Sequence, residues 1–200
     1  YAIIEGMREE ERLGINPFEV GFIGSTDTHN AAPGVVGEKT YPGTSGTMDN
    51  TAAKRLAMGA KRGVLNRNLA RNPGGLAGVW AEENSREAIF DALRQKETFA
   101  TSGTRIRPRF FAGWDLPADL CGRSDFAEVG YQQGVPMGGT LEGPPTSGNP
   151  PTFVVQALFD PGTTENPGNL LQRIQIVKGW YGEDDTFHQS VHEVAGSAAN

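Results

Sequence analysis

The apolar residues of this chain recur at spacings that predict both helices and strands. In residues 3–13 the spacing is helical, and Gly14 and Pro17 end this first helix. The apolar run over residues 20–23 is bounded by turn residues and therefore predicts a buried strand. A second buried strand is predicted over residues 75–81. Together these elements indicate a fold of the α/β class.

A helix and a further strand are predicted directly after these elements. Residues 84–96 have the spacing of an amphipathic helix, with Asn84 as its cap and Glu87 three residues on, as in a capping box. A strand over residues 98–101 follows. Strand, helix and strand within about 30 residues are typical of a βαβ unit, so we expect a parallel sheet here.

From residue 105 onward the pattern changes to partial alternation of apolar and polar residues. Such alternation is typical of antiparallel strands with one packed face and one wet face. Strands are predicted over residues 105–114, 152–159, 170–180 and 191–194, and one or two short helices over residues 117–134. We therefore place a domain boundary near residue 104, with residues 1–104 as the α/β part and residues 105–200 as a β-rich extension.

Composition and charge narrow the classes of function. The chain has 200 residues, enough for one domain or parts of two, and its formal charge of -6 disfavours nucleic acid and anionic membranes as partners. No apolar run reaches the ~18 residues of a transmembrane helix, so we expect no membrane span. The first residue, Tyr1, already stands within a helical pattern. This start predicts the C-terminal portion of a longer protein, whose upstream part is then a partner of this one.

One strongly basic segment interrupts the acidic chain. Residues 52–75 contain no acidic side chain and hold these cations: Lys54, Arg55, Lys61, Arg62, Arg67 and Arg71. One interpretation is a patch that attracts the phosphate, sulfate or carboxylate group of a small substrate. The other interpretation is a solvated surface segment, which charge runs usually are.

The polar residues after the first predicted strand have the chemistry of a metal site. Asp27 and His29 are two residues apart, so in an extended segment their side chains point the same way and can approach one point. A carboxylate and an imidazole are ligands of divalent metals such as Zn, Mn or Fe. The alternative is a strand-end turn with a capping aspartate and a surface histidine. A catalytic site needs three or four protein ligands, so further ligands are expected upstream.

Other predicted strand ends carry further candidate residues. Glu82 and Glu83 are candidate catalytic residues, because a carboxylate there can act as general base or bind a metal-linked water. Alternatively, they belong to the acidic first turn of the next helix. The hydroxyls of Thr101 and Ser102 either orient a substrate or only shape the turn. The candidate substrate-binding residues are Ser25, Asn30, Thr101 and Arg105.

The two remaining histidines lie in the β-rich tail. His188 and His192 are four residues apart, which places them on one face of a strand. Exposed strand histidines are far commoner than a second metal site, so we interpret them as surface residues.

Five segments have long and distinctive sequences: residues 21–30, 74–86, 99–105, 113–120 and 171–180. The first is GFIGSTDTHN and the second is GGLAGVWAEENSR. These segments resemble the C-terminal part of the DUF3604 family, and the resemblance covers nearly the whole chain. Members of that family are much longer than 200 residues, in keeping with the predicted upstream part.

The resemblance carries further implications. The DUF3604 family is related to the PHP (polymerase and histidinol phosphatase) metallohydrolases and resembles a carbaryl-hydrolase-like group. In PHP enzymes the last metal motif is Asp-x-His after a late strand of a distorted (β/α)7 barrel, and Asp27 and His29 match it. The earlier His-x-His motif has no counterpart in these residues. The resemblance implies that residues 1–104 are closing βα units of such a barrel, followed by an antiparallel, sandwich-like extension.

We therefore expect a fragment of a metal-dependent hydrolase that acts on a phosphoester or another ester. Divalent metal ions (Zn, Mn or Fe) are the expected cofactors, Asp27 and His29 the last metal ligands, and a small anionic molecule the expected substrate. The alternative is a non-catalytic ligand-binding or structural module with a vestigial barrel. A nucleic-acid role through the basic segment is disfavoured by the overall acidity.

Overall fold

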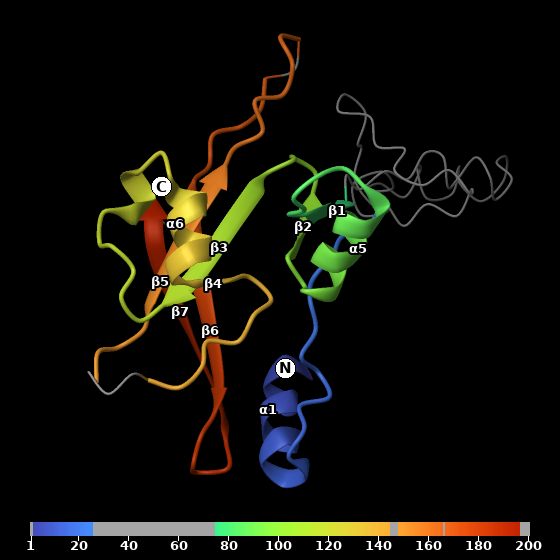
Figure 1. The fold of residues 1–200 in the computed structure, drawn as a ribbon. Coiled ribbons are helices and arrows are strands. Elements are labelled where there is room, and N and C mark those ends of the chain that lie inside the picture. The colour runs from blue at the N-terminus through green and yellow to red at the C-terminus, as the bar shows by residue number, and fades with distance from the viewer. Residues whose placement is uncertain (1, 26–74, 145–147, 166, 197–200) are drawn as a thin grey trace, which may run out of the picture. The chain divides into compact units, whose positions relative to one another are not determined.

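The computed structural model describes residues 2–25, 75–144, 148–165 and 167–196. They belong to two compact units, one of Tyr1–Val20 with Leu170–Asn200 and the other of Gly21–Asn169. The described residues form a mixed α/β structure whose sheets are small and antiparallel (Figure 1). Within these ranges no helix is long and apolar enough to cross a membrane.

The first unit consists of a helix and a β-hairpin. Helix α1 (Ala2–Leu13) ends before Gly14, whose φ of 76° stops the helix as the sequence predicts. Strands β6 (Arg173–Tyr181) and β7 (Phe187–Gly196) pair in antiparallel register. The helix packs on the hairpin where the side chain of Ile4 meets Gly179. The predicted helix and both predicted strands are confirmed, although β7 is longer than expected.

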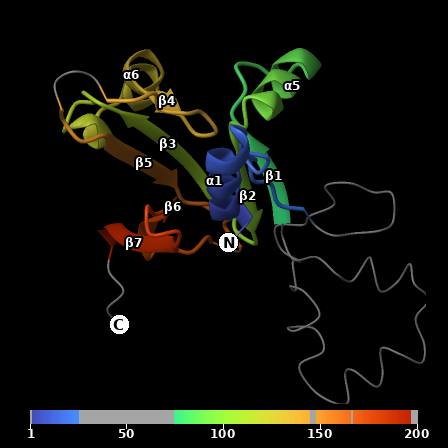
Figure 2. The ribbon, with the colours of Figure 1, turned by 90° about the horizontal axis from the view of Figure 1, so that it is seen from below.

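The apolar core of the second unit lies on a three-stranded sheet. Its strands are β3 (Arg107–Gly113), β4 (Val135–Pro136) and β5 (Thr152–Leu158), in the order β4-β3-β5. The helix α6 (Phe126–Gln133) and the short 3-10 helix η1 (Leu120–Gly122) pack against this sheet (Figure 2). The buried core residues are Phe111, Leu116, Leu120, Phe126, Val129 and Val154. The predicted antiparallel strands and short helices are confirmed here.

A second, two-stranded sheet in this unit corrects one expectation. Strands β1 (Gly75–Val79) and β2 (Thr98–Ser102) pair directly and antiparallel, whereas the sequence predicted a parallel βαβ unit. The connecting residues are numerous enough for a parallel crossover, so their length did not decide the direction. Lys96 has a φ of 62° and turns the chain back immediately before β2. The Trp80 N–H then donates to the Glu97 carbonyl at 3.0 Å, which continues the antiparallel pairing.

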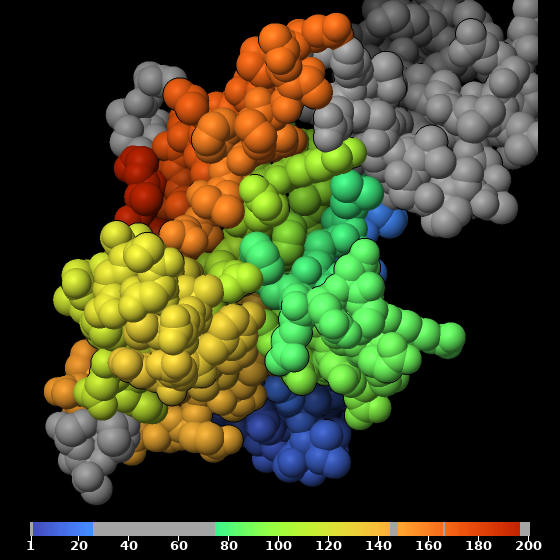
Figure 3. Space-filling model, turned by 45° about the horizontal axis from the view of Figure 1, so that its top comes forward, coloured from blue at the N-terminus to red at the C-terminus, as the bar shows by residue number. Residues whose placement is uncertain are grey.

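The helix between these strands starts one residue later than its sequence predicts. Helix α5 (Arg86–Arg94) has Ser85 as its N-cap, and the Ser85 hydroxyl accepts from the Ala88 N–H at 3.2 Å. Asn84 is therefore not the cap. One side of α5 lies at the surface of the unit (Figure 3), where Phe90 and Leu93 are exposed.

The predicted buried strand over residues 20–23 is not a strand in the structure. Phe22 is 59% and Ile23 is 62% exposed, and residues 21–25 adopt no regular secondary structure. They nevertheless run beside β2 in the same direction. A Cβ on Gly21 would lie 3.0 Å from the Thr98 hydroxyl, and one on Gly24 would lie 2.9 Å from the Thr101 carbonyl. These contacts are made through the two glycines, while the apolar side chains of Phe22 and Ile23 stay exposed.

The division near residue 104 stays a prediction, as does the sandwich-like packing of the extension. Contacts within the second unit join residues from both sides of that position. The indole Nε1 of Trp80 donates to the Pro108 carbonyl at 2.9 Å, and Tyr131 donates to Glu97 at 2.6 Å.

Candidate functional site

The predicted metal ligands Asp27 and His29 lie outside the described residues, as does Asn30. The basic segment over residues 54–71 lies outside them too. Among the residues that the structure does describe, no group of three or more His, Cys, Asp or Glu side chains is arranged to hold a metal ion. The structure therefore describes only the segment that leads to Asp27 and the strands beside that segment.

Ser25, the last described residue before Asp27, lies against the start of β1. A Cβ on Gly75 would collide with the Ser25 carbonyl, so the two backbones are in close contact. The neighbouring Gly24 approaches the carbonyl oxygens of Leu76 and Thr101 so closely that a Cβ there would lie 2.9 Å from each. Leu76 and Thr101 are paired across β1 and β2. The structure thus brings Ser25 and Thr101, two predicted substrate-binding residues, to the same end of the hairpin.

The Thr101 hydroxyl has a structural role at this end. It accepts a hydrogen bond from the Leu76 N–H at 3.1 Å, which links the two strands in addition to their backbone pairing. Thr101 is half-buried, whereas Ser102 next to it is exposed.

Arg105, the fourth predicted substrate-binding residue, is held through its backbone. Its N–H donates to Oδ2 of Asp160 at 2.7 Å, and the Gly162 N–H donates to Oδ1 of the same carboxylate at 2.9 Å. These two backbone hydrogen bonds, the one from Arg105 first, lower the pKa of Asp160 below its ordinary value. Asp160 therefore anchors the entry to β3 next to the end of β5.

Glu82 and Glu83, the predicted catalytic residues, lie at the other end of the β1–β2 hairpin. They follow β1 after Val79, which pairs with Thr98, and both side chains are exposed. The Leu76–Thr101 pair is three residue steps away along the strands, which corresponds to about 10 Å. In a parallel sheet the strand ends would have met at one edge. The antiparallel pairing places these carboxylates and Thr101 at opposite ends instead.

A polar cluster among the described residues of the second unit was not predicted from the sequence. The phenol of Tyr131 on α6 donates to Oε2 of Glu97 at 2.6 Å, and Glu97 is only 7% exposed. Burial, then the hydrogen bond to Glu97 and its charge, raise the pKa of Tyr131 to about 12, although the Arg109 cation acts in the opposite direction. Tyr131 is therefore a protonated donor throughout the physiological range.

Arg109 completes this cluster from β3. Its guanidinium carbon lies 3.8 Å from the ring centre of Trp80 and 5.7 Å from that of Tyr131. Cation–π contacts of this kind stabilise a partly buried cation. The cluster joins the end of β1, the start of β2, β3 and α6, so its evident role is to hold these elements together. Glu97 and Tyr131 are 34 residues apart, and no local spacing signals such a pair.

The histidines of the first unit lie on one face of β7, as predicted. His188 pairs across the hairpin with Trp180, and their rings stack at 5.2 Å. Nε2 of His188 lies 3.1 Å from Oδ1 of Asp184 and 2.8 Å from the Thr186 hydroxyl. Hydrogen bonds from Thr186 and His188 lower the pKa of the Asp184 carboxyl. These contacts stay within one hairpin and shape its turn.

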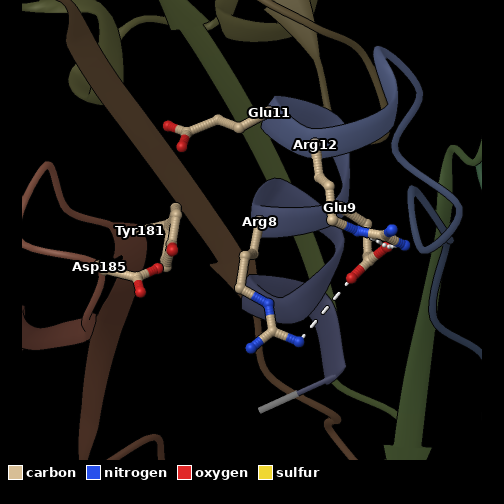
Figure 4. A pocket seen from close by; sticks show the side chains of 6 residues that line it. All are labelled: Arg8, Glu9, Glu11, Arg12, Tyr181 and Asp185. Atoms are coloured by element: carbon tan, nitrogen blue, oxygen red, sulfur yellow. Dashed lines mark hydrogen bonds and ion pairs between the residues drawn. The ribbon is translucent and has the colours of Figure 1, made fainter.

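A hollow of about 590 Å³ lies between α1 and the turn of this hairpin (Figure 4). Its lining residues are Arg8, Glu9, Glu11, Arg12, Tyr181 and Asp185. Both arginines form ion pairs with Glu9 on their own helix, and the hydrogen bond from Arg12 lowers the pKa of Glu9. The lining charges are therefore of both signs, and both arginines are paired on their own helix, which gives the hollow no clear preference for one class of ligand.

Comparison with known proteins gives one match. The model of the family described as "Protein of unknown function (DUF3604)" matches residues 1–200, which include both compact units. No curated protein and no solved structure matches the chain. The relationship to the PHP metallohydrolases stays a prediction, because the family description states neither a relative nor an activity.

Proposed function

Because the chain belongs to the DUF3604 family, whose description leaves its function open, we propose that it is part of a metal-dependent hydrolase acting on a phosphoester or another ester. Asp27 and His29 are the ligands that this chain contributes, and the metal is Zn, Mn or Fe. An imidazole and a carboxylate two residues apart fit these ions, which accept mixed nitrogen and oxygen ligands. The upstream part of the protein supplies the remaining ligands.

One observation carries this proposal: Ser25 and Thr101 lie at the same end of the β1–β2 hairpin. Residues 21–25 run beside β2 in the same direction, so both segments end at one edge. In α/β folds, functional groups gather where neighbouring strands end together. Asp27 follows Ser25 by two residues, and Ser102 directly follows Thr101. The shared edge is therefore the place where ligands and substrate-orienting hydroxyls would meet.

We also propose that this part of the chain closes a PHP-like (β/α)7 barrel. The same-direction course of residues 21–25 and β2, and the exposed apolar side chains of Phe22 and Ile23, suit a sheet that continues beyond the described residues. The antiparallel β1 departs from a regular barrel. Its place in the barrel is then that of a short hairpin strand beside β2 rather than a full βα unit.

The roles of this chain's residues follow from that arrangement. A bound divalent metal supplies a hydroxide near neutral pH and polarises the scissile group. Asp27 and His29 bind the metal, and the hydroxyls of Ser25 and Thr101 orient the substrate. The cations of residues 54–71 hold the negative charge of the substrate. Glu82 and Glu83 follow the opposite end of β1, so the proposal assigns them no part in the metal site.

A second proposal is a non-catalytic ligand-binding or structural module with a vestigial barrel. One observation favours it: a polar cluster of the second unit, formed by Trp80, Glu97, Arg109 and Tyr131, holds four structural elements together. Trp80 belongs to the distinctive segment over residues 74–86, so at least this residue of the segment has a structural role.

Metal analysis of the full-length protein tests the first proposal. Near-stoichiometric Zn, Mn or Fe is expected in the wild type, with a clear loss in Asp27→Ala/His29→Ala and loss of any phosphoesterase activity. The matched control is Glu82→Gln/Glu83→Gln, which changes two exposed carboxylates at the other end of the hairpin and keeps the metal. Unchanged metal content in the Asp27/His29 variant contradicts the proposal, and metal-free wild type favours the binding module.

A further inference from the structure

We propose that Arg107 and Arg109 on β3, together with Gln156 on β5, form a binding site for a phosphate group. The three residues lie in the part of the chain that the structure describes. None of them belongs to the proposed metal centre, so this site goes beyond the proposed function and does not depend on it.

The three side chains occupy neighbouring positions on one face of the β3–β5 sheet. Arg107 and Arg109 are two residues apart on β3, so they share a face with Phe111, and about 7 Å separates their Cα atoms. Gln156 is paired with Arg109 across the two strands, which places their Cβ atoms about 5 Å apart. Phe111 is fully buried beneath α6, whereas Arg109 and Gln156 are half-buried and Arg107 is exposed. The face therefore opens toward the start of β3.

Arg109 is held in place before any ligand arrives. Its guanidinium carbon lies 3.8 Å from the ring centre of Trp80 and 5.7 Å from that of Tyr131. A guanidinium stacks on an aromatic ring through its flat face, while its N–H donors lie in its plane and stay available to an oxyanion. Because the stack restricts the side chain, less conformational freedom is lost when a ligand binds.

Neither arginine has a counter-ion among the described residues. Other arginines in those ranges do lie within 4.0 Å of a carboxylate: Arg8, Arg12, Arg123 and Arg173. The carboxylates of Glu97 and Asp160, which belong to the same unit, accept hydrogen bonds from other groups. A half-buried cation without a counter-ion is unfavourable, and an anionic ligand supplies the missing charge.

The donor set favours a phosphate group over a carboxylate. Two guanidinium groups and one amide offer more N–H donors than the two oxygens of a carboxylate accept. A phosphate monoester has three terminal oxygens and a charge of about -2, which matches two arginines. The shared chemistry of free phosphate and of a phosphate monoester is therefore the expected ligand chemistry.

Calorimetric titration of the full-length protein at constant ionic strength tests the site. The probes are inorganic phosphate, methylphosphonate and acetate. Inorganic phosphate and methylphosphonate are expected to bind, and the tighter of the two shows whether free phosphate or a substituted phosphate group fits better. Acetate binding as tight as that of either probe overturns the assignment to a phosphate group.

Variants locate the bound probe. Arg107→Met removes a cation, and Arg109→Lys keeps the charge but loses the planar fork. Each is expected to lower the affinity about ten- to hundredfold, the loss typical of charge-assisted hydrogen bonds. Arg86→Met is the matched control, since it removes one exposed cation from α5, and its affinity should stay within about twofold of the wild type because distant exposed charges are screened.

Wild-type affinity in either site variant, or an equal loss in Arg86→Met, overturns the inference. Thermal unfolding is measured in parallel. If Arg109→Lys does not fold, Gln156→Ala replaces it beside Arg107→Met, with loss of affinity again expected in both.

The same titration in Asp27→Ala/His29→Ala separates this site from the proposed metal centre. Wild-type affinity for phosphate is expected there. Loss of phosphate binding in that variant instead of in the arginine variants overturns this inference and leaves the hydrolase proposal standing. A wild type that holds no metal but still binds phosphate through Arg107 and Arg109 removes the proposed function and keeps the phosphate site.

Discussion

The guanidinium of Arg109 stacks on the indole of Trp80, with its carbon 3.8 Å from the ring centre. This contact joins β3 to the end of β1. Replacing Arg109 with Met keeps an unbranched apolar stem but removes the cation. We expect the free energy of unfolding to fall by about 1–2 kcal/mol, the range for a partly desolvated cation–π contact. Urea unfolding followed by tryptophan fluorescence measures it.

Arg107→Met is the control for that prediction. Arg107 lies on the same strand and the same face, two residues before Arg109, but it is exposed. Its replacement is expected to change the free energy of unfolding by no more than about 0.5 kcal/mol. A similar loss in both variants would mean that overall charge, rather than the stacking on Trp80, accounts for the effect.

Tyr131→Phe removes the donor to a buried carboxylate. The free energy of unfolding at pH 7 is expected to fall by about 1–3 kcal/mol, because Glu97 loses a hydrogen bond where water does not replace it freely. The pKa of Tyr131 is raised from 10.0 to about 12, so its contribution is complete below pH 10 and is lost as the pH rises toward 12. The difference between the two proteins should therefore narrow over that interval.

Urea unfolding at pH 8, 10 and 11.5 measures how the difference in unfolding free energy between the wild type and Tyr131→Phe changes with pH. An ultraviolet titration at alkaline pH gives an independent check, because the wild type should contain a late-ionising phenol that the variant lacks. A constant difference between the proteins at all three pH values would show that the hydroxyl does not act through Glu97.

Asp160→Asn tests the anchor at the start of β3. The amide can accept only one of the two backbone hydrogen bonds, from Arg105 and Gly162, as well as the carboxylate does. We expect a loss of about 0.5–1 kcal/mol at pH 7, since the half-buried carboxylate accepts from two neutral backbone donors. The pKa of Asp160 is lowered, so its stabilisation is complete well above its ordinary pKa of 3.8 and is lost as the pH falls from there through the lowered pKa. Guanidinium unfolding at pH 7 and pH 3 should therefore show a smaller difference between the two proteins at pH 3.

Ser85→Ala and Asn84→Ala separate the observed cap of α5 from its neighbour. Ser85 accepts from the Ala88 N–H, so its replacement should lower the free energy of unfolding by about 1 kcal/mol. Asn84 is exposed, and its replacement should change the stability by less than about 0.5 kcal/mol. Thermal unfolding followed by circular dichroism compares them, and a larger effect at Asn84 would contradict the observed cap.

Local patterns predicted most elements of this fold. Helix α1, strands β3, β5 and β6, and the short helices before β4 all lie where apolar spacing and turn residues indicate. These signals are local because a helix or strand end depends on nearby residues. The N-cap of α5 was harder to predict, because Asn84 and Ser85 are both good capping residues. Only the backbone conformation in the structure shows that Ser85 is the cap.

Local sequence patterns did not predict the features that depend on distant residues. The antiparallel pairing of β2 with β1 is accompanied by a left-handed conformation at Lys96, and the local sequence signals neither. The apolar run at residues 20–23 has a buried strand's composition, yet its burial depends on what packs against it. The pair of Glu97 and Tyr131 bridges 34 residues. At the candidate site, Ser25 and Thr101 lie at one end of the β1–β2 hairpin and Glu82 and Glu83 follow the other end, because the pairing of distant strands decides which strand ends meet.

The contact between Ser25 and Gly75 is made by the carbonyl of Ser25, a group that every amino acid carries. Position 25 can therefore hold another residue and keep this contact, whereas position 75 has no room for a side chain. The two ends of one contact are thus under unequal restriction: the side chain at position 25 can vary, and the glycine at position 75 cannot.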